Sequence, residues 1–153
     1  MQDFKRVRVW QDGRALTVAL HEATRSFRPA EAPNLRSQLL RASMSISATV
    51  AEGAGRDTRV DFARFVSMAI ASASEVEHHL QVCSDLGLIE QVLIEQLVDR
   101  VTQLRRMLFG LRRTLLAKEG KRPGSRNTAT INAVDRPLAA GDGKRRTGLP
   151  EPS

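Results

Sequence analysis

Several residue types that would define a class of protein are scarce in this sequence. Cys83 is the one cysteine, so no disulfide can form within the chain, and a reducing cytoplasm is the simplest compartment for such a chain. Tyrosine is absent and aromatic residues make up 4% of the chain, which argues against base stacking as the main mode of binding nucleic acid. No apolar run reaches the roughly 20 residues of a membrane-spanning helix. We therefore expect a cytoplasmic protein with no membrane segment.

The residue patterns of enzyme active sites are missing as well. No serine lies in a G-x-S-x-G elbow, and the run 51–56 lacks the pattern of a phosphate-binding loop. Cys83 falls on an apolar stripe, as a small core residue would. Glu75 and His78 have the E-x-x-H spacing of di-iron bundles, but neither His21 nor His79 completes a second pair, which such a site needs. We expect a protein that is not an enzyme and that holds no metal or cofactor.

What the sequence does contain is positive charge and a helical apolar pattern. Among 153 residues there are 24 Lys and Arg against 17 Asp and Glu, so the formal net charge is +7. Residues 119–153 carry seven of these basic residues against four acids. A basic balance favours contact with a polyanion, because binding releases counterions from the phosphates. Nucleic acid, RNA or DNA, is therefore a candidate partner.

Four stretches carry apolar residues at the alternating four-three spacing that keeps one stripe on one side of an α-helix. They predict helices over residues 9–27, over 35–56, from a cap at Asp57 or Thr58 to Leu86, and over 90–117. Short connections between amphipathic helices make sequential helices antiparallel neighbours. We therefore predict an all-α protein, an antiparallel up-down-up-down four-helix bundle at residues 1–118.

Local signals predict where these helices begin and end. Asn34 is expected to cap the second helix. Gly53 and Gly55 are expected to end it, and Gly87 to end the third helix, because glycine adopts the left-handed conformation at little cost. Phe4 and Val7 are expected to pack on the bundle from an extended lead-in.

Small residues interrupt the apolar stripes of the second and third helices. Small side chains let neighbouring helices approach closely, so two such patches facing each other predict unusually tight packing of these helices. The patches consist of Ala42, Ser43, Ser45, Ser47, Ala48 and Ala51 on the second helix, and Ala69, Ala71, Ser72, Ala73 and Ser74 on the third.

The helical periodicity stops at residue 119. Gly, Pro, Ser, Thr and basic residues dominate from there to residue 153, and large apolar residues are few. This composition predicts a disordered basic C-terminal tail. Lys121 and Arg122 at its start are candidate contacts to nucleic acid.

Basic residues also lie on the outer side of the last predicted helix. Arg105, Arg106, Arg112 and Arg113 form two adjacent pairs seven residues apart, and seven residues are two helical turns, so the pairs align. They are candidate phosphate contacts that would repeat into a basic belt in an oligomer. The alternative is a solvated face on which Glu95 and Asp99 serve as ion-pair partners.

A second polar set lies near the small-residue patches. Arg41 and Glu52 fall within or beside the packed face of the second helix, and two charges there need partners. With Arg56 and Glu75 they predict a structural network that locks the second helix to the third. The alternative is that the same four residues hold an anion or contact another subunit.

Trp10 lies beside the seam of the first predicted helix. Its position predicts a core or interface anchor with a hydrogen-bonded indole, and stacking on a base is the alternative.

The motifs together resemble one bacterial family. They are Phe4, Val9-Trp10-Gln11, Gln38-Leu39-Leu40-Arg41-Ala42, Ser45-Ile46, Val50-Ala51-Glu52-Gly53, Gly55-Arg56, Arg64-Phe65, Ala69, Ser72, Glu75 and Leu86-Gly87-Leu88-Ile89. Residues 4–117 are similar in these features to the four-helix-bundle proteins encoded in intervening sequences of the 23S ribosomal RNA gene. A related branch is the accessory protein of diversity-generating retroelements.

The resemblance implies more than the residues do. It implies a homo-oligomer, often a pentamer; the retroelement branch is a basic pentamer that binds nucleic acid and the reverse transcriptase, and most members have no assigned activity. With the basic charge of this chain, this leads us to expect an accessory module that binds nucleic acid, RNA in particular, through a basic surface. The alternative it raises is a protein-interaction scaffold, for example an accessory subunit of a reverse transcriptase. Thr49 departs from the family pattern, which has Asn before the run at Val50; threonine keeps one hydroxyl but loses the paired donor and acceptor of the amide.

Overall fold

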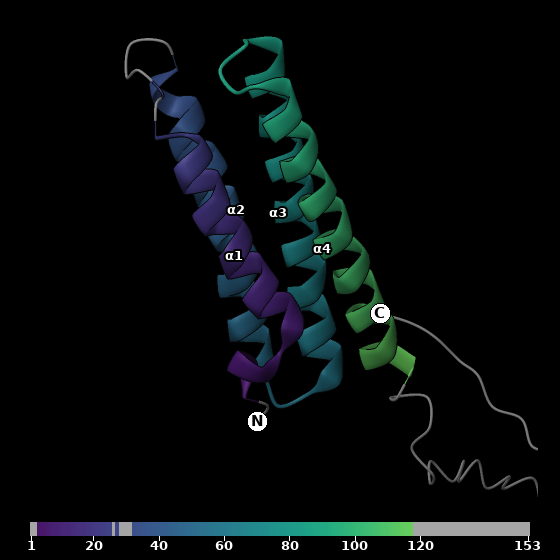
Figure 1. Cartoon of the computed structure of the whole chain (residues 1–153). Coiled ribbons are helices and arrows are strands. Elements are labelled where there is room, and N and C mark those ends of the chain that lie inside the picture. The colour runs from purple at the N-terminus through teal and green to yellow at the C-terminus, as the bar shows by residue number, and fades with distance from the viewer. Residues whose placement is uncertain (1–2, 26, 28–31, 118–153) are drawn as a thin grey trace, which may run out of the picture. The chain divides into compact units, whose positions relative to one another are not determined.

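Four antiparallel helices make up most of residues 3–25, 27 and 32–117, which the computed structural model describes. A 3-10 turn, η1 (Phe4–Arg6), precedes α1 (Arg8–Ala23), α2 (Pro33–Ala54), α3 (Arg59–Asp85) and α4 (Gln91–Ala117). Each helix packs against the next and α1 packs against α4, while the diagonal pairs of described helices stay apart (Figure 1). The predicted all-α up-down-up-down bundle is confirmed.

The apolar stripes of all four helices meet inside the bundle. Burial of each large aliphatic side chain stabilises the fold by about 1.5–3 kcal/mol. Within α2, Val50 is fully buried, while Leu35 and Thr49 are half-buried. The side chains with no exposed surface include Leu20, Leu39, Ile46, Val66, Leu80, Val101 and Leu108. No helix in the described ranges is long and apolar enough to cross a membrane.

The small residues do bring helices together as predicted. The hydroxyls of Ser45 in α2 and Ser72 in α3 form a hydrogen bond of 3.0 Å, which requires the two backbones to be close. Gly13 makes the same approach possible between α1 and α2, because a Cβ there would lie 3.4 Å from the Cβ of Ser47. Close packing of α2 therefore occurs on two sides.

The first helix is shorter than predicted and ends at Ala23. Thr24 is buried, and its hydroxyl donates to the carbonyl of Leu20 at 2.8 Å. Its carbonyl accepts from the backbone N–H of Phe27 at 3.2 Å and from Nε of Arg36 at 3.1 Å. These bonds tie the end of α1 to the start of α2, and the chain turns there.

The predictions for the ends of α2 were wrong for Asn34 and Gly53, whereas Gly55 is the C-cap residue that follows the helix, as predicted. Asn34 lies inside the helix, since Ala32 is the cap residue and Pro33 occupies the first turn, where its fixed φ suits a helix start. Gly53 lies within α2, and Gly55 has a φ of −84°, so neither takes the left-handed conformation. Gly53 is needed for space, because a Cβ there would lie 2.6 Å from the Cβ of Phe65.

Two of the other predicted ends are confirmed. The Thr58 hydroxyl caps α3 by accepting from the backbone N–H of Asp61 at 3.1 Å. Gly87 has a φ of 63°, the left-handed conformation expected after α3. The lead-in is a 3-10 turn rather than an extended strand, but Val7 is buried and Phe4 packs against the core as predicted.

Cys83 is a core residue, and this leads to a prediction about its reactivity. Its side chain is fully buried, and burial raises the pKa of the thiol to about 11. The thiolate is the reactive form, so we expect a thiol reagent at pH 8 to modify the folded protein far more slowly than the denatured protein. Absorbance measured with Ellman's reagent, with and without guanidinium chloride, gives both rates. Equal rates would contradict the burial of this residue.

Candidate nucleic-acid interface

The C-terminal half of α4 presents arginines on its outer side. Leu104, Leu108 and Leu115 are buried along the inner side of this segment, and this orientation directs the residues between them away from the core. The α4 arginine surface, as we call it, consists of Arg106, Arg112 and Arg113, which are all exposed.

Arg105 does not belong to this surface, contrary to the sequence prediction. It forms an ion pair and hydrogen bond with Glu77 of α3, and 28% of its side chain is exposed. The carboxylate neutralises the charge that a phosphate would need. Arg105 therefore holds α4 against α3, a role that was hidden in the sequence because its partner lies 28 residues away.

The three surface arginines keep their charge available. Nε of Arg112 donates to the hydroxyl of Ser67 at 2.8 Å, which orients the side chain without neutralising it. The structure gives no ion pair to Arg106, Arg112 or Arg113 within the residues it describes. The expected partner Glu95 accepts instead from Gln91 at 3.1 Å. The described residues therefore form a solvated face, without the ion pairs to Glu95 and Asp99 that the alternative included.

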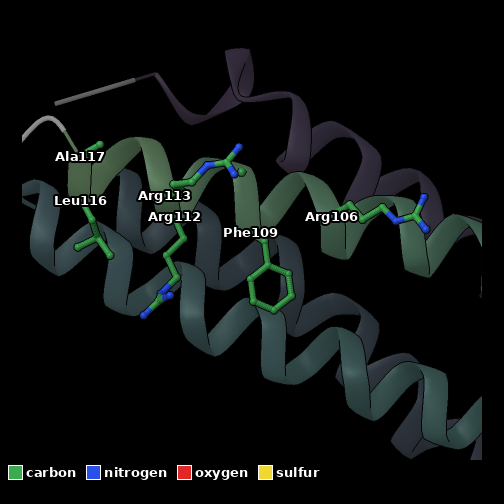
Figure 2. A pocket seen from close by; sticks show the side chains of 7 residues that line it. Arg106, Phe109, Arg112, Arg113, Leu116 and Ala117 are labelled. Atoms are coloured by element: carbon green, nitrogen blue, oxygen red, sulfur yellow. The ribbon is translucent and has the colours of Figure 1, made fainter.

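A pocket opens on the same surface. It is lined by the three surface arginines together with Phe109, Gly110, Leu116 and Ala117. Figure 2 shows Phe109, Arg112 and Leu116 directed to one side of α4, with Arg106 and Arg113 on the other. The Phe109 side chain is 52% exposed and Leu116 is 39% exposed. Phe109 was not predicted as a site residue from the sequence, although its position between the arginine pairs was visible there.

Trp10 is held within a cluster at the start of the bundle. Its ring meets that of Phe4 edge to face at a centroid distance of 5.1 Å, and the guanidinium of Arg14 lies 4.9 Å from its centroid. Trp10 is half-buried against the core. These contacts favour the anchor predicted for Trp10 over stacking on a base.

The predicted polar network is two separate ion pairs. Nη2 of Arg41 lies 3.8 Å from Oε1 of Glu75 and links α2 to α3. Arg56 pairs with Glu52 one turn away, and its guanidinium lies over the ring of Phe65 at 4.5 Å. These charges lie beside the packed face and not within it, since the Arg41 side chain is 70% exposed and that of Glu52 is 58% exposed. Exposed pairs of this kind contribute about 0–1 kcal/mol each.

The E-x-x-H pair is not assembled into a metal site. His78 is exposed, whereas Nε2 of His79 lies 3.5 Å from Oε1 of Glu75. Within the described ranges, no three His, Cys, Asp or Glu side chains gather where they could hold a metal ion. Glu75 instead pairs with Arg41 of α2.

Comparison with known proteins decides the family. Residues 5–110 match the model of the 23S rRNA-intervening sequence protein family. The chain belongs to this family. A solved structure, described as a protein of unknown function from the S23 ribosomal protein family of Bacteroides thetaiotaomicron, shares 21% identity with a TM-score of 0.57. The match covers 68% of this chain and 97% of that one and shows the fold alone. No curated protein matches.

The α4 arginine surface lies partly inside and partly outside the range that matches the family model. Arg106 and Phe109 lie inside the matched residues, and Arg112 and Arg113 follow its end at residue 110. The predicted tail, with the candidates Lys121 and Arg122, lies outside both the match and the described residues. The α4 arginine surface of this chain thus lies across the end of the matched range.

Proposed function

We propose that this 23S rRNA-intervening sequence protein binds nucleic acid, and RNA in particular, as a non-enzymatic accessory module. The observation that carries the proposal is the α4 arginine surface, where three exposed guanidinium groups on one segment lack an acidic partner among the described residues. A guanidinium group matches a phosphate with two parallel hydrogen bonds and remains charged at all physiological pH values. RNA is chosen among the polyanions as the expectation drawn from the family resemblance, because the family description itself names no ligand.

The proposed mechanism is electrostatic. Each arginine that contacts a phosphate releases condensed counterions, so affinity falls steeply as salt is raised. Phosphate contacts position the protein without reading the base sequence. We therefore expect weak sequence specificity and a strong dependence of the dissociation constant on salt.

The test changes Arg106, Arg112 and Arg113 together to Ala. We expect affinity for structured RNA at low salt to fall about tenfold or more, and the slope of log K against log[salt] to become shallower by about two, at 0.7–0.9 per lost phosphate contact. Fluorescence anisotropy with a labelled RNA measures both quantities.

A matched control removes the same charge elsewhere. Arg25, Arg59 and Arg64 are exposed, and two of them are paired, Arg25 with Glu22 at 3.1 Å and Arg64 with Asp61 at 3.2 Å. Changing these three to Ala should reduce affinity much less. Equal losses in the two triple variants would mean that net charge alone, and not the α4 arginine surface, governs binding. If only truncation after Ala117 abolishes binding, the tail is the contact.

A scaffold that binds protein is the second candidate. Two exposed methionines favour it, Met44 on α2 at 54% and Met68 on α3 at 56%, because exposed apolar side chains suit contacts between proteins. A homo-oligomer, the pentamer that the family resemblance implies, would use such a surface, and so would a partner such as a reverse transcriptase. Light scattering on the samples used for RNA binding gives the oligomeric state. An oligomer that binds no RNA at low salt would favour the scaffold.

A further inference from the structure

The ring of Phe109 lies on the outer side of α4, away from the core of the bundle. Among the aromatic residues that the structure describes, it alone is exposed, at 52%, while Phe62 in the core is 5% exposed. Phe4, Trp10 and Phe27 pack against the core cluster. An exposed ring leaves apolar surface in contact with water, which is unfavourable. A binding role would account for its position.

The neighbours of Phe109 are the three surface arginines. Arg106 precedes it by three residues, and Arg112 and Arg113 follow it by three and four. Residues at these spacings are neighbours on a helix surface, with Cβ atoms about 5–6 Å apart. All four side chains line the pocket; Arg112 is directed to the same side of α4 as the ring, and Arg106 and Arg113 to the other side (Figure 2).

We propose that the ring of Phe109 stacks on an unpaired base while Arg106, Arg112 and Arg113 hold the neighbouring phosphates. This inference rests on the proposed function and narrows its ligand to single-stranded RNA, such as loops and strand ends. In a duplex the base faces are covered by neighbouring pairs, so a ring on a helix surface cannot reach them, whereas unpaired bases can be splayed out onto an aromatic side chain.

Charge complementarity favours RNA over an apolar partner. Three cations line the pocket together with one ring and one partly exposed leucine, Leu116, so the charged groups there favour a ligand with several anionic groups. A nucleotide strand supplies both a π-face and adjacent phosphates, as single-strand-binding surfaces require. Electrostatic contacts to phosphates remain the main contribution to the binding free energy. The single stacking contact makes the protein prefer single-stranded RNA to duplex RNA.

The test compares Phe109→Leu, Phe109→Trp and the unchanged full-length protein. Leucine keeps the apolar bulk but has no π-face. We expect Phe109→Leu to weaken binding of a short unstructured RNA strand by roughly fivefold or more, and to leave binding of the duplex of the same sequence unchanged. Phe109→Trp should retain strand binding, and the fluorescence of the introduced indole should be quenched by the strand but not by the duplex. Val18→Ala, which truncates an exposed apolar side chain on α1, should change neither affinity.

The outcomes separate this inference from the proposed function. If the triple arginine variant loses affinity for both the RNA strand and the duplex, while Phe109→Leu keeps its affinity for both, the proposed function stands and the stacking inference is wrong. If the unchanged protein binds no RNA at low salt, both fail. Binding of anionic lipid vesicles that Phe109→Leu abolishes, or a change in the mass of the assembly in either Phe109 variant, would show that the ring serves a membrane or a subunit contact and would overturn the inference.

Discussion

Replacing Gly53 with alanine is expected to destabilise the bundle, although the same change in most helices is stabilising. A Cβ at this position would lie 2.6 Å from the Cβ of Phe65 and 2.7 Å from Cδ2 of Phe62. The Cβ of Phe65 cannot move without the backbone of α3, so α2 and α3 must separate locally. Overpacking of this kind costs about 1–3 kcal/mol, which outweighs the gain of about 0.5–1 kcal/mol from alanine in a helix.

The chain provides matched controls for this experiment. Gly110 lies in α4, and a Cβ added there would meet no atom within 4 Å, so Gly110→Ala should be stabilising by about 0.5–1 kcal/mol. A Cβ added at Gly13 would lie 3.4 Å or more from its neighbours, so the change in unfolding free energy for Gly13→Ala should lie between those for Gly53→Ala and Gly110→Ala. Urea unfolding followed by circular dichroism at one protomer concentration gives all three free energies. Equal effects at Gly53 and Gly110 would contradict the close approach of α2 and α3.

Truncation of Leu108 to alanine is the change with the largest expected loss of stability. Leu108 has no exposed surface and lies on the inner side of α4 beneath the arginine surface. A buried leucine replaced by alanine leaves a cavity and costs about 2–5 kcal/mol, a large part of the roughly 5–15 kcal/mol that typically stabilises a domain. Because Leu108 fixes which side of α4 faces the core, its loss should also weaken RNA binding at temperatures where the variant is partly unfolded.

The control for Leu108 is an apolar residue on the same helix that is exposed. Val92 is 66% exposed, so Val92→Ala should change the free energy of unfolding by no more than about 0.5 kcal/mol. Thermal and urea unfolding of the two variants measure the difference directly. A loss for Leu108→Ala as small as that for Val92→Ala would mean that the inner side of α4 has been assigned wrongly.

The family motif around Gly53 has a physical explanation in this fold. Gly53 allows the phenylalanines of α3 to pack against α2, and Glu52 and Arg56 pair on the outside of the same turn. Thr49, where the family pattern has Asn, is half-buried. The described residues give its hydroxyl no hydrogen bond to another helix. The motif therefore serves the packing of α2 on α3, and the proposed RNA contacts lie elsewhere, on α4.

Periodicity by itself determined the four helices, their antiparallel order and most of the buried side chains of this protein. This was possible because the spacing of apolar residues depends only on the local geometry of a helix. The same local reasoning located the left-handed Gly87 and the Thr58 cap, since both act within a few residues of their partners.

Only the tertiary structure decided which charged residues are available for binding. The sequence placed Arg105 and Arg106 together, but the register between α3 and α4 brings Glu77 to Arg105 and leaves Arg106 exposed. The register between two packed helices is set by side chains that are far apart in the sequence, so it cannot be predicted from the local spacing of residues. The role of Gly53 likewise depends on Phe62 and Phe65 of the neighbouring helix. The exposure of Phe109 depends on which side of α4 packs into the core.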